Sequence, residues 1–115
     1  MLIALTAALA FAAGPVQDAT DAQTHRIAIE IRQPRWTCFT GLIAEGSTWG
    51  SLRRIETPGC PELPWAILVR EERSGWREVR RFHSRRAACR ARPKRLAAAQ
   101  RRALLGCHSA DSSHQ

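Results

Sequence analysis

Four cysteines are the residues best suited to covalent chemistry in this chain of 115 residues. An even number of cysteines in a short chain is typical of an exported protein with disulfides. Successive cysteines lie 22, 29 and 18 residues apart, too far for the close C-x-x-C pairs of a zinc site, and none lies in a redox or protease motif. We therefore expect no metal and no cofactor, but two disulfides formed by Cys38, Cys60, Cys89 and Cys107.

The second set of candidate residues is basic, and most of it lies in the C-terminal half. Residues 63–107 hold thirteen basic and three acidic side chains, whereas residues 23–62 hold five and four. Such a surface attracts anions. Trp65 and Trp76 could add stacking on bases or sugars. The anion-binding candidates are Arg80, Arg81, Arg85, Arg86, Arg90, Arg92, Lys94, Arg95, Arg101 and Arg102.

A solvated surface without a partner explains the same basic pattern. Arginines on the outer face of an alanine-rich helix are commonly just hydrated, and tryptophans in a hairpin usually belong to the core. The abundance of alanine, arginine and proline, with no tyrosine or asparagine, is typical of a GC-rich genome, so part of the arginine excess reflects codon usage. Because no zinc-finger spacing or RNA-binding aromatic signature occurs, we favour an anionic envelope component or an acidic protein over nucleic acid as partner.

Residues for acid–base catalysis are harder to find. The four histidines are His25, His83, His108 and His114. Only His83 lies where active sites are common, between an expected strand and helix, and neither G-x-S-x-G nor H-E-x-x-H occurs. The carboxylates among the C-terminal arginines are interpreted as charge partners: Glu71, Glu72 and Glu78. We expect a structural or binding protein rather than an enzyme; the alternatives are an inhibitor or hydrolase with its site in loop 45–64, and a poorly expressed or non-functional reading frame.

The N-terminal segment predicts export. Residues 2–13 are apolar except for Thr6, and this run is shorter than the roughly 20 residues that span a bilayer. Small residues end the run, as signal peptidase requires. No Lys or Arg precedes it, which departs from the usual signal-peptide pattern. The alternative interpretation of this segment is a buried first helix. We expect a signal peptide in 1–12, a polar linker in 13–24, a domain in 25–107 and a flexible tail in 108–115. The mature protein would be periplasmic or secreted, without a membrane span.

The hydrophobic pattern predicts a small α+β domain. His25 to Arg32 alternates between isoleucine and polar or small residues, which predicts a strand, and Trp36 to Ala44 predicts a second. Trp65 to Glu71 and Trp76 to Phe82 predict a hairpin around the turn Arg73-Ser74-Gly75. Residues 45–50 are expected to form a turn and 51–64 an irregular segment, because the latter contains three prolines.

A helix is expected after the hairpin. Ser84 is a good N-cap, and Arg85 to Leu105 is rich in alanine and arginine, although Pro93 should kink or split the helix. The block from Phe82 to Cys89 resembles small exported bacterial proteins over about eight residues, a resemblance that implies no activity. The expected fold is an antiparallel sheet of three to four strands with one C-terminal helix, stapled by disulfides.

The pairing of the cysteines follows from this expected fold. On one straight helix, 18 residues would separate Cys89 from Cys107 by about 27 Å, whereas a disulfide needs Cα atoms within about 7 Å. In a four-stranded meander with the helix running back across the sheet, Cys89 falls beside Cys60 and Cys107 beside Cys38. We therefore expect the pairs Cys60–Cys89 and Cys38–Cys107; the sequential pairing would require the chain to reverse near Pro93.

Overall fold

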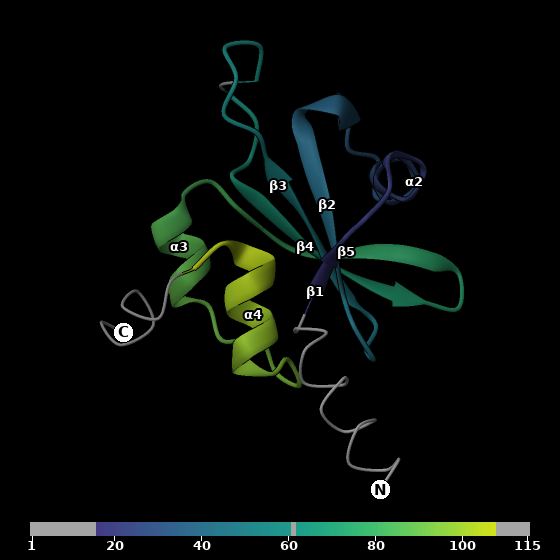
Figure 1. Cartoon of the computed structure of the whole chain (residues 1–115), viewed down its shortest axis with the longest axis vertical. Helices are drawn as coiled ribbons and strands as arrows, with labels where there is room; N and C mark the ends of the chain where they lie inside the picture. The colour runs from purple at the N-terminus through teal and green to yellow at the C-terminus, as the bar shows by residue number, and fades with distance from the viewer. Residues whose placement is uncertain (1–15, 61, 108–115) are drawn as a thin grey trace, which may run out of the picture.

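The computed structural model describes residues 16–60 and 62–107. The signal peptide expected in 1–12 and the tail expected in 108–115 lie outside this range. Within these described residues, five strands form one antiparallel sheet in chain order, with three α-helices packed around it (Figure 1). The elements are β1 (Val16–Asp18), α2 (Asp21–Glu30), a 3-10 turn (Trp36–Cys38), β2 (Phe39–Ala44), β3 (Trp49–Arg54), β4 (Ala66–Glu72), β5 (Gly75–Phe82), α3 (Arg85–Arg90) and α4 (Ala98–Leu105).

The sheet has an apolar layer on each face, because alternate side chains of a strand point to opposite sides. On one face, the buried residues Leu42, Leu68 and Phe82 pack against α3 and α4. On the other face, Leu52 and Ile67 pack against α2. Figure 1 shows α2 on one side of the strands and α3 and α4 on the other. The α+β class and the antiparallel sheet are therefore confirmed, with five strands instead of three to four.

Residues expected as the first strand form most of a helix. In α2, the Thr20 hydroxyl accepts a hydrogen bond from the Gln23 amide at 3.1 Å, and the Gln23 side chain accepts one from the Thr20 amide at 2.8 Å. This capping box starts the helix at Asp21, four residues before His25, where the segment with alternating isoleucines begins. Ile27 is buried against the sheet, whereas Ile29 is 61% exposed. The described part of the segment expected as a linker, 16–24, contributes β1 and the start of α2.

The central strand β3 was expected to be partly turn and partly irregular. It pairs with β2 on one side and with β4 on the other. Its two small residues explain why the segment does not look like a strand. A Cβ at Gly50 would lie 3.2 Å from the Trp76 ring, and the Ser51 hydroxyl donates to the Leu104 carbonyl of α4 at 2.7 Å. Close packing from both sides therefore requires small residues where a buried strand usually has large ones.

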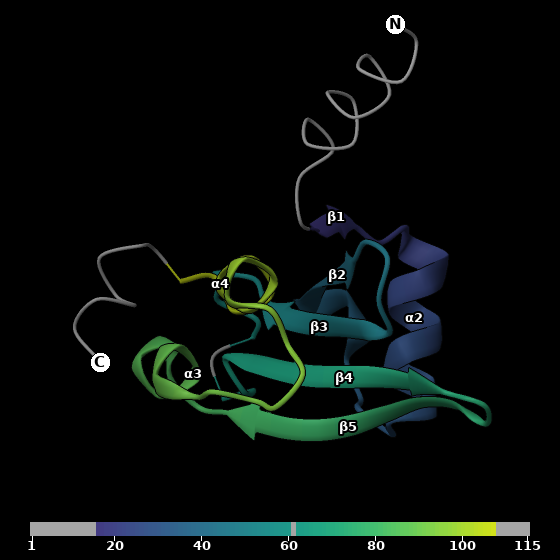
Figure 2. The same cartoon turned by 90° about the horizontal axis from the view of Figure 1, so that it is seen from below.

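The second half of the domain follows the expectation more closely. The hairpin expected over residues 65–82 is confirmed as β4 and β5, and β2 confirms the later part of the strand expected over 36–44. Ser84 caps α3, since its hydroxyl accepts from the Ala87 amide at 3.1 Å. The single C-terminal helix is split into α3 and α4, and Pro93 lies in the reversal between them. Figure 2 shows α3 leaving the end of β5 and lying beside α4.

Both disulfides join consecutive cysteines, so the expected pairs Cys60–Cys89 and Cys38–Cys107 are wrong. The structure pairs Cys38 with Cys60 and Cys89 with Cys107, with Cα–Cα distances of 5.8 and 5.6 Å. The unrecognised strand β3 returns the chain alongside Cys38, where the Ile55 amide donates to the Cys38 carbonyl at 2.9 Å. The chain also reverses between α3 and α4, near Pro93, and this reversal brings Cys107 back to Cys89. The expectation of two disulfides is itself confirmed.

Candidate functional site

The ten basic candidates differ in how much of each side chain reaches solvent. Seven are exposed: Arg80, Arg81, Arg86, Arg90, Arg92, Lys94 and Arg95. Arg85 and Arg102 are half-buried, and Arg101 is only 4% exposed. Arg81 is paired with Glu78 at 2.6 Å, and Arg80 lies over the Phe82 ring. The structure therefore leaves most, but not all, of the candidates accessible to a partner.

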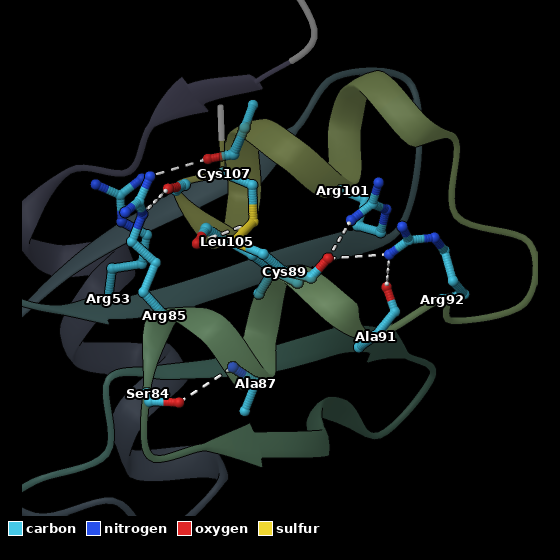
Figure 3. The surroundings of a disulfide bond; sticks show 12 residues. Arg53, Ser84, Arg85, Ala87, Cys89, Ala91, Arg92, Arg101, Leu105 and Cys107 are labelled. Atoms are coloured by element: carbon cyan, nitrogen blue, oxygen red, sulfur yellow. Dashed lines mark hydrogen bonds between the residues drawn. A yellow bond between two sulfur atoms is a disulfide. The ribbon is translucent and has the colours of Figure 1, made fainter. Parts of the chain in front are cut away.

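Arg101 is part of the domain interior. It donates a hydrogen bond to the Cys89 carbonyl at 3.3 Å, and Arg92 donates to the same oxygen at 3.0 Å (Figure 3). Burial lowers the pKa of Arg101, and the charges of Arg92 and Arg102 lower it further. Arg101 thus ties α4 to the C-terminal end of α3 beside the disulfide and is not available to a ligand.

An open pocket of about 480 Å³ lies on the other side of the same disulfide. It is formed where the ends of β3, α3 and α4 meet the segment before β4. Its wall combines four arginines, one carboxylate and an indole, together with the α4 residues Ala103 and Gly106 and the disulfide residue Cys107. The charged and aromatic members are Arg53, Arg54, Glu56, Trp65, Arg85 and Arg102. We refer to this pocket as the arginine groove.

Two of the arginines are held in place by the C-terminal end of α4. Arg53 donates to the Ala103 carbonyl at 3.4 Å, and Arg85 donates to the Gly106 carbonyl at 3.2 Å. Figure 3 shows both guanidinium groups on the same side of the disulfide. Carbonyls at the C-terminal end of a helix carry partial negative charge, which favours such contacts with cations. These bonds position both side chains at the groove.

Arg53 is the most unusual member of the groove. Its guanidinium lies over Trp65, 5.4 Å from the ring centroid, and its buried Nε has no hydrogen-bond partner among the residues that the structure describes. Burial lowers its pKa, and the charge of Asp18 opposes this effect. None of the three ion pairs found in residues 16–60 and 62–107 involves Arg53. A cation that is partly desolvated and lacks a carboxylate in contact would be stabilised by an anion.

Gly106 allows these groups to come together. Its φ of 69° is left-handed, the conformation that glycine commonly adopts at the end of a helix. A Cβ there would also lie 3.0 Å from both the Arg53 guanidinium carbon and the Trp65 ring. The arginine–tryptophan stack can therefore pack against α4 only because this position has no side chain.

A second pocket, of about 430 Å³, adjoins the arginine groove and shares Arg53, Arg54, Glu56 and Ala103 with it. Asp18 also lines this second pocket. Its wall thus has two arginines and two carboxylates, whereas the arginine groove has four arginines and one carboxylate. The arginine groove is accordingly the better candidate for binding an anion.

Charged side chains supply most of the chemistry available in the two pockets. Among the described residues that line the two pockets there is no histidine, serine or free thiol; loop 45–64 supplies Glu56 to both pockets, and the second pocket also has Asp18 and Thr40. His83 is exposed and lies outside both pockets. Within the described part of the chain, no cluster of three or more His, Cys, Asp or Glu side chains could hold a metal ion. In that same part, no helix has the length and apolar character needed to cross a membrane.

Sequence reasoning identified only part of this site. Arg85 and Arg102 were among the candidates, and Trp65 was noted for stacking, whereas Arg53 and Arg54 were missed. The adjacent pair Arg53-Arg54 was the available signal, but it lies in a segment expected to be irregular. Trp76, the other tryptophan considered for stacking, packs partly buried against the core on the α2 side.

The fold and site define a small, basic α+β protein with two disulfides. In comparisons with known proteins, no family model, curated protein or solved structure matches the chain.

Proposed function

We propose that this is an exported, non-enzymatic binding protein that engages an anionic partner through basic side chains on and around α3 and α4. One observation carries the proposal: residues 79–107 contain ten basic side chains and no acidic one. Of the three ion pairs found in residues 16–60 and 62–107, two lie outside this segment, Arg26–Glu30 and Arg77–Glu72, and the third joins Arg81 to Glu78 on β5. Residues 79–107 therefore keep a large excess of positive charge even with Arg81 paired.

Four of these side chains carry most of the argument. They are exposed, and in residues 16–60 and 62–107 they have no hydrogen bond, ion pair or ring contact: Arg86, Arg90, Lys94 and Arg95. All four belong to α3 or to the reversal that follows it. An exposed cation without a structural partner contributes little to folding stability, so we assign these side chains to an anionic ligand.

The two disulfides support export. Disulfides persist in oxidising compartments such as the periplasm or the extracellular space. The cysteines of the described chain are all in disulfides. We therefore propose a periplasmic or secreted location, in which the phosphates of envelope lipids and acidic proteins are the available polyanions.

A salt series with anionic vesicles tests the proposal. We expect the affinity to fall steeply with salt, because screening weakens contacts between exposed charges. Replacing Arg86, Arg90 and Arg95 by Gln should reduce affinity about a hundredfold, since each basic residue near an anionic membrane contributes about 1 kcal/mol. The matched control replaces Arg32, Arg73 and Arg77, which are exposed elsewhere, and should lose far less. Affinity that is independent of salt, or equal losses in both variants, would overturn the proposal.

A further inference from the structure

We propose that the arginine groove is a discrete site for one phosphate monoester, with the phosphate against the arginines and its ester group on Trp65. This inference rests on the proposed function and specifies the ligand of one part of the basic surface. The monoester could belong to a soluble molecule or to a lipid headgroup, since both present the same dianionic group.

The charge of the wall favours a dianion. Among the described residues of the wall, four arginines face one carboxylate, Glu56, which gives these residues a net charge of +3. A single carboxylate ligand would leave most of this charge uncompensated, whereas a phosphate monoester carries about −1.5 to −2 at neutral pH. Guanidinium groups also match phosphate oxygens geometrically, because each can donate two parallel hydrogen bonds.

The bonding of the individual arginines favours a ligand over a purely structural role. Arg102 lines the groove half-buried, and its side chain has no hydrogen bond or ion pair with any residue of 16–60 or 62–107. Arg53 donates one hydrogen bond, to Ala103, although a guanidinium has five N–H groups. Arg54 is oriented by a bond to the Leu63 carbonyl at 2.7 Å. Arg53 and Arg54 are thus held in place by hydrogen bonds, whereas Arg102 has no partner within the described residues. The site is therefore organised before a ligand binds.

The size and the aromatic wall point to an ester rather than to free phosphate. A cavity of about 480 Å³ is larger than a bare phosphate ion requires and lies within the usual range of small-molecule sites. Trp65 is half-buried and contributes an aromatic ring to the wall. An organic group attached to the phosphate would gain contact area on this ring, which inorganic phosphate cannot.

Titration of the intact, disulfide-bonded protein with phenyl phosphate tests the site. Calorimetry should show saturable binding at one site, tighter than that of inorganic phosphate or benzoate. In nuclear magnetic resonance spectra, the Trp65 indole signal, assigned with Trp65→Phe, should shift along the same curve. Arg102→Gln should weaken binding about tenfold, as expected for the loss of a charge-assisted contact. Arg73→Gln removes an exposed arginine outside the groove and should change binding less than about twofold.

Vesicles identify the source of the phosphate. Preference for phosphatidic acid, a monoester, over phosphatidylglycerol at equal surface charge, with competition by phenyl phosphate, supports a lipid ligand. Saturable binding of phenyl phosphate without that preference supports a soluble one. No saturable binding, equal effects of Arg102→Gln and Arg73→Gln, or equal affinity for benzoate would overturn the site. If the groove does not bind phenyl phosphate but vesicle binding still depends on Arg86, Arg90 and Arg95, the proposed function stands without the groove site. If neither kind of binding is observed, both proposals are overturned.

Discussion

Arg92 and Arg101 donate hydrogen bonds to the same acceptor, the carbonyl oxygen of Cys89, at 3.0 and 3.3 Å. Two like charges converge on this oxygen because it belongs to the C-terminal end of α3, where unpaired helix carbonyls carry partial negative charge. One of the two side chains is exposed and the other is buried. The two arginines should consequently differ in what they contribute to stability.

Replacing Arg101 by Ala should lower the free energy of unfolding by about 2 kcal/mol or more, through lost packing of the buried stem and the lost hydrogen bond to Cys89. Urea denaturation followed by circular dichroism measures the change. Arg90→Ala, which removes an exposed arginine of the neighbouring helix, should stay within about 0.5 kcal/mol of the parent protein. Equal stability of the two variants would contradict a structural role for Arg101.

Gly106→Ala should cost about 1–2 kcal/mol, because an alanine in the left-handed conformation is strained. The added methyl group would also displace Arg53 or Trp65, so phenyl phosphate binding should weaken together with stability. The matched control is Gly59→Ala, since a Cβ at that position meets nothing within 4 Å. If Gly106→Ala is as stable as Gly59→Ala, the helix end does not have the conformation described above.

Limited reduction should open Cys89–Cys107 before Cys38–Cys60. Cys107 is half-exposed, whereas Cys38 and Cys60 are both buried, and thiol–disulfide exchange requires access to a sulfur. Alkylation of the released thiols followed by peptide mapping would identify the bridge that opens first. Peptide mapping of the unreduced protein would establish the sequential connectivity.

Removing either bridge by paired alanine substitutions should lower the free energy of unfolding by about 3 kcal/mol by the loop-entropy relation, since the two separations, 22 and 18 residues, are similar.

Glu30 should make the domain sensitive to acid. Its carboxylate accepts from the Trp76 amide at 2.7 Å and from Arg26 at 2.9 Å, and these two bonds hold its pKa below the ordinary value of 4.5. The stabilisation is present above that ordinary value and is lost as the pH falls through the lower pKa of the folded state. Glu30→Gln should therefore flatten the acid side of the stability–pH profile, measured by thermal melting. Glu62→Gln, which removes an exposed carboxylate, controls for the change in net charge.

The sequence predicted the fold class and the C-terminal hairpin because their signals are local. Strands β4 and β5 are rich in β-branched and aromatic residues around a glycine turn, and Ser84 precedes a helix that it caps. The isoleucines of residues 27–31 were ambiguous, because Ile27 and Ile31 are also four residues apart and so share a helix face. The preceding T-x-x-Q motif at Thr20 favoured the helix, but it lay in a segment interpreted as linker.

The missed parts of the site depend on contacts between distant segments. Gly50 and Ser51 belong in a strand because Trp76 and Leu104 pack against them, and neither partner is near them in sequence. Without β3, Arg53 had no defined position relative to α4. The disulfide pairing failed for the same reason, since the strand that was not recognised brings Cys60 back to Cys38. Local patterns thus identified basic residues, whereas only the tertiary fold identified which of them share a groove.

The sequential connectivity also bears on how the protein acquires its bridges. Each disulfide joins two cysteines that are neighbours along the chain, so Cys60 follows Cys38 out of a ribosome or a translocation channel before Cys89 appears. An oxidase that joins thiols in their order of emergence produces the native pairs directly. Maturation of this protein would then require an oxidant but no disulfide isomerase.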